Sequence, residues 1–203
     1  MENRMKKGTI WMALGVLLII GALSLTVYNI QDEKRAKQES LDVVEHLSEE
    51  IIKNTEEKVE LEDVPLYVDH PDMEMPTISI DKNRYIGILE IPALGLELPI
   101  MSNWNYSNLK VSPCRYDGSV YSKDLIIAGH NYNGHLGLVN SLIPGDIVLF
   151  TDADGNQFEY EVFETEILDG TSVEEMKDGE WDMTLFTCTY SGQARVTVRL
   201  VQI

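Results

Sequence analysis

Three residues in the C-terminal part of the sequence carry the side chains needed for nucleophilic catalysis. Cys188 ends a predicted strand, Arg195 opens the next strand seven residues later, and His130 ends an earlier strand. A thiolate is a strong nucleophile, an imidazole exchanges protons near neutral pH, and a guanidinium is always charged and carries five hydrogen-bond donors. Because strand ends lie at the rim of a barrel, where a substrate has access, the pattern predicts a nucleophile, a base and a cation in one site.

Other residues of the same types compete for these roles, and the sequence leaves some of the choices open. Arg199 alternates in phase with Arg195 and lies on the same strand face, about 13 Å further along at the usual strand rise. Cys114 is interpreted as a structural thiol, with a Cys114–Cys188 disulfide as the alternative that would disable the site. His135 is interpreted as a loop histidine, with a substrate contact as the alternative.

From residue 84 onward, apolar and polar residues alternate with the period of strands. Turn residues separate these segments, and short helical segments fit at 106–109, 136–142 and 173–176. Many short strands with brief helical connections, in about 120 residues, indicate one mainly β domain at 84–203, either a barrel or a sandwich. The predicted strands are Tyr85–Ile91, Leu96–Met101, Leu125–Ala128, Asp146–Phe150, Gln157–Phe163, Met183–Thr187 and Arg195–Val201.

The N-terminal region contains an apolar segment of 22 residues, Thr9–Ile30, without a charged side chain. At about 1.5 Å per residue, a helix of this length spans roughly 33 Å, enough to cross a bilayer core of about 30 Å. The segment is longer than the apolar region of a cleaved signal peptide, and no cleavage site follows it, so we expect an uncleaved signal anchor. Residues 1–8 are then cytoplasmic, 9–30 cross the cell membrane once, and the remainder is extracellular.

Residues 31–83 carry 16 acidic and 6 basic side chains and are predicted to form an acidic stalk and linker. Three prolines between Val64 and Pro76 interrupt any helical period there, so that stretch is predicted to be extended. Before it, apolar residues recur at the three- and four-residue spacing of an amphipathic helix, at Leu41, Val44, Leu47 and Ile51.

The composition of the chain excludes several function classes. The formal net charge is −18, and nucleic-acid binding needs clustered lysine and arginine, so no nucleic-acid partner is expected. Two cysteines without a Cys-x-x-Cys motif indicate neither a zinc site nor a disulfide framework. Asp152–Asn156 is similar to part of a calcium loop, but position 12 of such a loop is Phe163 rather than glutamate. A turn is predicted there, and no metal or cofactor is assigned.

Several motifs together resemble the sortase family. Thr184-Leu-Phe-Thr-Cys188, followed by a strand that begins with Arg195, is similar to the sortase signature Thr-Leu-x-Thr-Cys and its arginine strand. Ala128-Gly-His-Asn131 resembles the histidine strand of the family, and Gly87–Pro92 resembles its first barrel strand. These motifs occur in family order over residues 84–203, behind one N-terminal anchor, and the combination is far more specific than any of its parts.

The resemblance implies a membrane-anchored extracellular cysteine transpeptidase, of the kind found mostly in Gram-positive bacteria, with a closed eight-stranded β-barrel. Cys188 would attack the threonine carbonyl of a Leu-Pro-x-Thr-Gly-like sorting signal on a surface protein. An amine from a peptidoglycan precursor or a pilin lysine would then resolve the thioacyl enzyme. His130 would act as acid and then as base, and Arg195 would stabilise the oxyanion or hold substrate carbonyls. Thr187 and Asn131 are candidate supporting residues; some sortases bind calcium, but no ligands are assignable here.

The sequence favours a small class D-like or unclassified sortase. His130-Asn131 and the residues that follow resemble class B. However, the 57 residues between His130 and Cys188 leave little room for the helical insertion of that class.

Two other functions are open at the level of sequence. A cysteine peptidase or peptidoglycan hydrolase is disfavoured because papain-like enzymes place the cysteine before the histidine, whereas His130 precedes Cys188 here. The alternative outside enzymes is a non-catalytic stalked surface adhesin or receptor domain, in which Cys114 and Cys188 would be joined in a disulfide.

Overall fold

The computed structural model describes the backbone of residues 2–59 and 64–203 and the side chains of residues 8–56 and 64–203. It contains two compact units, Met1–Arg35 and Ala36–Ile203, which we describe one at a time. The long helix α1 (Glu2–Val59) contributes its first part to the first unit and its last part to the second.

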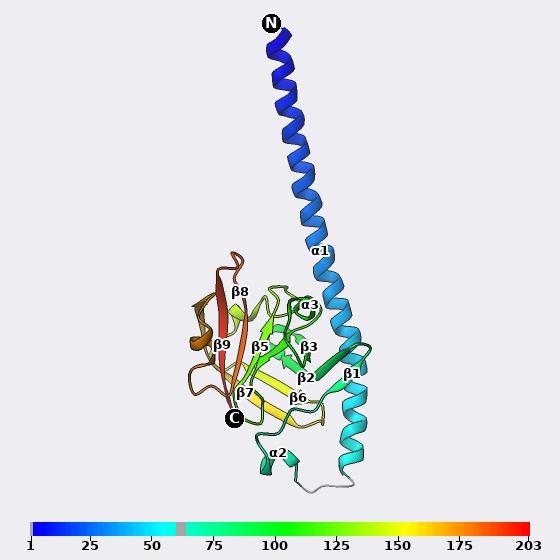
Figure 1. Cartoon of the computed structure of the whole chain (residues 1–203), viewed down its shortest axis with the longest axis vertical. Coiled ribbons are helices and arrows are strands. Elements are labelled where there is room, and N and C mark those ends of the chain that lie inside the picture. The colour runs from blue at the N-terminus through cyan, green and yellow to red at the C-terminus, as the bar shows by residue number, and fades with distance from the viewer. Residues whose placement is uncertain (1, 60–63) are drawn as a thin grey trace. The chain divides into compact units, whose positions relative to one another are not determined.

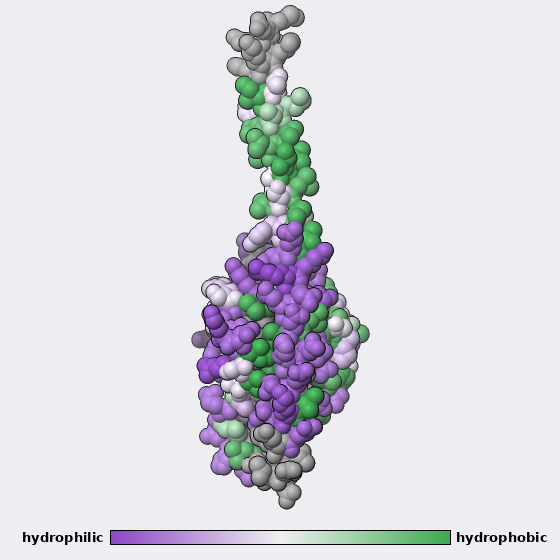
Figure 2. Space-filling model, turned by 90° about the vertical axis from the view of Figure 1, so that its right-hand side faces the viewer, coloured by the Kyte–Doolittle hydropathy of each residue, from purple (hydrophilic) through white to green (hydrophobic). Residues whose placement is uncertain are grey.

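The first unit is helical and carries the predicted membrane anchor. Among the described residues, one helical segment, Gly8–Glu56 of α1, is long and apolar enough to cross a membrane by length and composition. Its large apolar side chains between Ile10 and Ile30 are exposed, and Figure 2 shows them as a hydrophobic stretch of this helix. Such side chains favour lipid over water, so the helix is a candidate membrane anchor.

Eight strands of the second unit close into a barrel (Figure 1), as the family resemblance implies. Their order is β2-β3-β4-β5-β8-β9-β7-β6, and β6 pairs with β2 to complete the ring. A ninth strand, β1, pairs with the first residues of β2. The strands are β1 (Ile78–Ile80), β2 (Asn83–Ile91), β3 (Leu96–Met101), β4 (Cys114–Asp117), β5 (Leu125–Gly129), β6 (Ile147–Asp152), β7 (Gln157–Asp169), β8 (Met183–Cys188) and β9 (Ala194–Gln202).

Gly87 lies where the barrel closes. Its φ is +155°, and the register of β2 against β3 shifts between Tyr85 and Gly87. A Cβ atom at this position would lie 2.1 Å from the backbone oxygen of Thr151 on β6. Only glycine therefore allows β2 to leave β1 and approach β6 closely enough to pair.

Short helices connect the strands on the barrel surface. An Asn105 side chain caps α3 by accepting hydrogen bonds from the backbone N–H groups of Ser107 and Asn108, at 2.9 and 2.8 Å. The short helices are α2 (Leu66–Asp69), η1 (Pro92–Leu94), α3 (Tyr106–Leu109), η2 (Val139–Ser141) and α4 (Val173–Lys177).

The helical segment that the sequence predicts as a stalk belongs to the barrel unit instead. Val44, Leu47 and Ile51 of α1 are buried in one hydrophobic cluster with strand residues such as Tyr85. The predicted domain boundary at residue 84 therefore differs from the structure, in which the compact unit begins at Ala36. The physical reason is that the amphipathic stripe has an apolar partner on the barrel, so the helix buries it there rather than leaving it in water.

Two strands and one helical turn lie outside the predicted elements. Strands β1 and β4 contain only three and four residues, too few for an alternating pattern to be recognised. The predicted extended linker contains the single turn of α2, and Tyr67 of that turn stacks on Tyr121, with ring centroids 4.7 Å apart. Aromatic packing therefore ties this segment to the barrel unit.

Candidate active site

The pairing of three neighbouring strands brings the predicted catalytic residues to one end of the barrel. Strands β8 and β9 are antiparallel, and Cys188 is paired directly with Arg195. Strands β5 and β8 are parallel, and Gly129 is paired with Thr187. His130 follows Gly129 just as Cys188 follows Thr187, so the imidazole and the thiol leave adjacent strands at the same level. The strand register thus brings the three residues to the same end of the barrel, with Cys188 and Arg195 directly paired and His130 on the neighbouring strand.

Cys188 and Arg195 line a pocket of about 200 Å³. Ala128 and Gly129 of β5 form part of its wall, and Asp169, Gly170 and Ser172 contribute polar atoms near Arg195. The rest of the wall is mainly aromatic and aliphatic: Trp104, Tyr106, Leu109, Tyr116, Val173, Met176 and Phe186. An apolar pocket beside a half-exposed thiol suits the side chains of a short peptide, with the scissile carbonyl placed at the sulfur.

Arg195 is the strand partner of Cys188, and its guanidinium uses only part of its hydrogen-bond donors. Its Nη1 donates hydrogen bonds of 3.1 Å to the backbone oxygens of Gly192 and Ala194. The pKa of the Asp169 carboxyl is lowered, mainly by hydrogen bonds from Thr171 and to a smaller extent by the charge of Arg195. The remaining guanidinium donors are available to an oxyanion or to substrate carbonyls, as the sequence predicts for this residue.

Arg199 has a different environment from Arg195, although both belong to β9. Its side chain is buried, and Nε donates a 2.8 Å hydrogen bond to the Glu166 carboxylate. The other nitrogens donate to the backbone oxygens of Met176 and Glu175 and to the Thr184 hydroxyl. With its donors engaged in this way, Arg199 joins α4 to the barrel wall.

The His130 imidazole stacks on the Tyr132 ring, with centroids 4.0 Å apart and ring planes 8° from parallel. Because the two residues are close in the same loop, this contact fixes the plane in which the imidazole presents its nitrogens. From the sequence, Tyr132 is one of several aromatic residues for which a peptide groove and ordinary packing are both possible. In the structure, the Tyr132 ring packs against one face of the His130 imidazole.

The two supporting residues predicted from the sequence have different positions. The Thr187 side chain is 2% exposed and, because strand side chains alternate, points to the opposite face of β8 from Cys188. Its hydroxyl is buried and has no hydrogen-bond partner among the described residues. The expectation that Thr187 supports the site through this hydroxyl is therefore wrong, and only its backbone can do so. Asn131 is half-buried next to His130 but is not one of the described residues that line the Cys188 pocket.

Cys114 and Cys188 are both free thiols, which contradicts the alternative of a disulfide between them. Cys114 lies at the start of β4, completely buried in the cluster that includes the α1 residues Val44 and Leu47. Burial raises the pKa of its thiol to about 12, so this sulfur stays protonated and unreactive. Cys114 is thus a structural thiol, more deeply buried than the sequence suggests.

The segment Asp152–Asn156 is a turn that its own aspartate organises. One carboxylate oxygen of Asp152 accepts hydrogen bonds from the backbone N–H groups of Asp154 and Asn156, both at 2.9 Å. The other oxygen accepts from the Asn156 amide at 2.8 Å and from the Tyr121 hydroxyl at 2.7 Å. Both oxygens are therefore engaged by the protein itself, and a cation would have to displace these donors.

His135 is buried rather than mobile, which corrects the interpretation from the sequence. Its side chain is 0% exposed, and its ring lies 5.5 Å from the ring of Tyr132. Neither imidazole nitrogen has a geometrically acceptable hydrogen-bond partner among the described residues. Burial lowers the pKa of this imidazole to about 4, with a smaller contribution from the nearby His130.

We expect the stability of the barrel to fall below pH 7 because of His135. Its pKa is about 4 when folded and about 6.5 when unfolded, so the unfolded chain binds the proton first as the pH falls. The free energy of unfolding should therefore decrease between about pH 7 and pH 4, by roughly 3 kcal/mol, and change no further from this group below pH 4. Urea unfolding of the wild-type chain and His135→Leu at several pH values measures this; equal pH slopes for the two proteins would contradict it.

The fold is a closed eight-stranded barrel in which a free thiol and an arginine are paired at the end of two neighbouring strands. The sortase domain model matches residues 89–202, more than half of the chain, and the chain therefore belongs to the sortase family.

Similar proteins are found among both sequences and structures. Sortase A of Bacillus anthracis is 31% identical over 128 residues, and the match covers 60% of this chain and 60% of that protein. Sortase C of Streptococcus pneumoniae has a TM-score of 0.61 at 18% identity, covering 80% of this chain and 96% of that one. The Sortase D5 transpeptidase of Clostridium perfringens has a TM-score of 0.52 at 20% identity, covering 76% and 99%. These two structures share the fold of this chain.

Proposed function

We propose that this chain is a membrane-anchored transpeptidase that cleaves a Leu-Pro-x-Thr-Gly-like sorting signal and transfers the acyl part to an amine. The observation that carries the proposal is the direct pairing of Cys188 with Arg195 at a mainly apolar pocket. His130 leaves the neighbouring strand one residue beyond the Gly129–Thr187 pair, which supports its role as the proton donor and acceptor.

The proposed reaction has two acyl-transfer steps. In the first, the Cys188 thiol gives its proton to His130, its sulfur attacks the threonine carbonyl, and Arg195 donates hydrogen bonds to the oxyanion that forms. The carbon–nitrogen bond to glycine breaks as His130 protonates the leaving amine, which leaves a thioester on the sulfur. In the second step, His130 accepts a proton from the incoming amine, a new amide bond forms, and the Cys188 sulfur leaves and takes that proton from His130.

The test is incubation of the full-length chain, in detergent, with a library of such sorting-signal peptides and an amine, followed by mass spectrometry. A thioacyl adduct on Cys188 and an amide product with the added amine are expected. His130→Ala should lose turnover as well. If adducts form only on other residues, or if no peptide of a broad library is cleaved, the proposal is wrong.

The proposed partners and location follow from the anchor and the acceptor chemistry. The α1 segment holds the chain in the cell membrane as a single-pass protein with a cytoplasmic N-terminus, and the catalytic barrel is extracellular. The partners are surface proteins with C-terminal sorting signals, and the acceptor amine comes from a peptidoglycan precursor or a pilin lysine. Protease accessibility of the barrel in intact cells tests this orientation; digestion only after cell lysis would contradict it.

Tyr132 is expected to affect the chemical step through the orientation of His130. Stacked aromatic pairs contribute about 0.5–1.5 kcal/mol, so Tyr132→Leu should lower kcat by roughly three- to tenfold with little change in KM for the peptide. Tyr132→Phe keeps the stacked ring and should retain most of the kcat. Steady-state kinetics of the two variants measure the effect, and an equal loss in both would show that the hydroxyl, rather than the stacking, is needed.

A further inference from the structure

The loop that begins with His130, residues 130–137, is a compact turn, which we call the histidine loop. Within it, the backbone oxygen of Tyr132 accepts hydrogen bonds from the N–H groups of His135 and Gly137, both at 2.9 Å. The Leu136 side chain is completely buried in the barrel core and holds the end of the loop there. Because the Tyr132 ring is stacked on the imidazole, a shift of this loop also shifts the imidazole. The position of the imidazole therefore depends on what the loop packs against.

One turn of α1, in its part that belongs to the barrel unit, packs on the histidine loop at Gly134. Gly134 is buried, and a Cβ atom on it would lie 3.0 Å from the Cβ and 3.3 Å from the Cγ of Lys37. Lys37 thus covers the loop with its aliphatic stem, while the side chain as a whole is exposed. Ala36 and Ser40 of the same helical turn are 1% and 3% exposed, so this turn is closely packed. Any side chain at Gly134 would push the loop and the helix apart.

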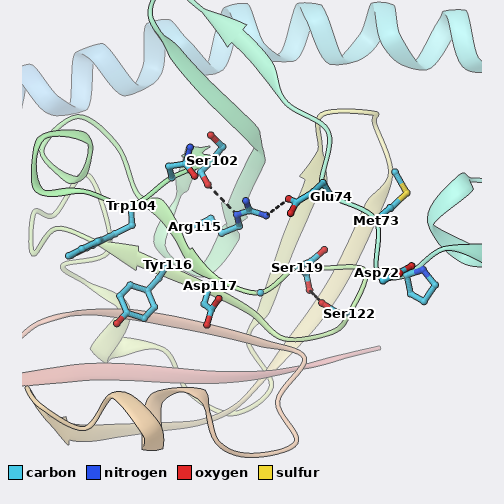
Figure 3. Close-up of a pocket in the computed structure, with 13 residues that line it drawn as sticks. Asp72, Met73, Glu74, Ser102, Trp104, Arg115, Tyr116, Asp117, Ser119 and Ser122 are labelled. Atoms are coloured by element: carbon cyan, nitrogen blue, oxygen red, sulfur yellow. Dashed lines mark hydrogen bonds and ion pairs between the residues drawn. The ribbon is translucent and has the colours of Figure 1, made fainter.

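The same helix belongs to the hydrophobic cluster that supports one wall of the Cys188 pocket. Leu109 lines that pocket and packs against the cluster, which includes Val44 of α1. Trp104 and Tyr116 continue the wall beside Leu109, and their rings meet edge to face at 5.7 Å (Figure 3). The helix therefore supports both the pocket and the histidine loop.

We propose that Lys37 and Gly134 are positioning residues, through which α1 fixes the His130 imidazole relative to the Cys188 sulfur. The stem of Lys37 stops the loop on one side, and the buried Leu136 holds its end in the core. The inference rests on the proposed function, because it concerns the residue that transfers the proton in that reaction. It gives α1 a second role besides the proposed membrane anchor, since the helix is then part of the framework of the active site.

The test exchanges the two sides of this contact in the full-length enzyme. Gly134→Ala adds a methyl group against α1, at a backbone position outside the left-handed region. The loop must then move by a few tenths of an ångström, which should lower kcat roughly three- to tenfold and leave the KM for the sorting-signal peptide unchanged. Lys37→Gly leaves a gap instead and should lower kcat about threefold. The double variant has one Cβ between loop and helix, as the wild-type chain has, and should reach a kcat within about twofold of wild type.

Asn54→Ala is the matched control on α1. The Asn54 amide donates a 2.9 Å hydrogen bond to the backbone oxygen of Ala153, which lies in the turn between β6 and β7 and outside the histidine loop. This variant should lose stability in urea unfolding and keep the wild-type kcat per folded molecule. The positioning role would be overturned if Asn54→Ala lost as much kcat as Gly134→Ala, or if the losses of the two single variants multiplied in the double variant.

The outcomes also separate this inference from the proposed function. A wild-type chain that forms no thioacyl adduct with any peptide would overturn both proposals. An active wild-type chain whose kcat is unchanged by Gly134→Ala would overturn the positioning role alone. If Gly134→Ala does not fold, Lys37→Ala is compared with Lys37→Gly. Alanine keeps the Cβ that abuts Gly134 and should keep most of the kcat, so equal values for these two variants would overturn the positioning role.

Discussion

Replacement of Cys188 with alanine should abolish the thioacyl adduct and lower the turnover of a sorting-signal peptide by at least about a thousandfold. The thiol is the strongest nucleophile among the described residues that line the pocket with Arg195, and alanine leaves the neighbouring strands unchanged. Mass spectrometry of the intact protein measures the adduct, and peptide release measures the turnover. Removal of a nucleophile leaves only the binding and oxyanion contributions of the site, so some residual activity over water is compatible with the mechanism.

The matched control is Cys114→Ala, because Cys114 is the other cysteine of the chain. Its sulfur is buried, and the raised pKa of its thiol keeps it protonated, so it takes no part in the chemistry. The control should lose about 1 kcal/mol of stability through the small cavity that it creates and should keep its adduct on Cys188. A wild-type level of turnover in Cys188→Ala, or loss of the adduct in Cys114→Ala alone, would show that the nucleophile is assigned to the wrong residue.

Most of the barrel could be predicted because its longer strands follow the two-residue period of half-buried sheets. Strand β9 is the clearest case: it alternates along its length and was predicted as Arg195–Val201, within one residue at each end of the observed Ala194–Gln202. Closure of the barrel could not be predicted in the same way. It depends on the close approach of β2 to β6, at Gly87 and Thr151, and these residues are far apart in the sequence. The eight-stranded ring came from the family resemblance rather than from the alternation.

The end of α1 shows a second limit of prediction. An amphipathic stripe indicates that a helix has an apolar face, but it does not indicate which surface covers that face. The spacing of Val44, Leu47 and Ile51 was visible in the sequence, whereas their burial against the barrel is a long-range contact. The high content of acidic residues, which suggested a solvated stalk, describes only the outer face of this helix.

The candidate site could be predicted to the extent that its residues lie at strand ends. Cys188, His130 and Arg195 needed only the motifs and their order, and the strand register then brings them together. The alternation rule by itself already separates Thr187 from Cys188, because adjacent residues of a strand point to opposite faces. The stacking of Tyr132 on the imidazole could not be predicted, since it depends on the loop conformation after β5.

Substitutions of the two arginines of β9 should have opposite effects, one on the rate of the reaction and the other on the stability of the fold. Arg195→Ala should lower kcat/KM by about a hundred- to a thousandfold, as removal of one oxyanion donor does, and should leave the unfolding free energy nearly unchanged. Its side chain bonds only to backbone oxygens of its own turn, at Gly192 and Ala194, which other donors can satisfy. Arg199→Met should do the reverse. It leaves the Glu166 carboxylate, the buried backbone oxygen of Met176 and the partly buried backbone oxygen of Glu175 without their donor, at a cost of about 3 kcal/mol.

The comparison is decisive because both substitutions remove one guanidinium from the same face of the same strand. Arg195 faces the Cys188 pocket, whereas Arg199 lies four residues further along, paired with Thr184 and covered by α4. Chemical unfolding gives the stability, and activity per folded molecule, corrected by active-site titration with a thiol reagent, gives the chemical effect. If Arg199→Met lost activity per folded molecule while Arg195→Ala kept it, the oxyanion donor would have to be reassigned to Arg199. The structure predicts the opposite, because four of the five N–H donors of the Arg199 guanidinium are already bonded to protein oxygens and its side chain is buried.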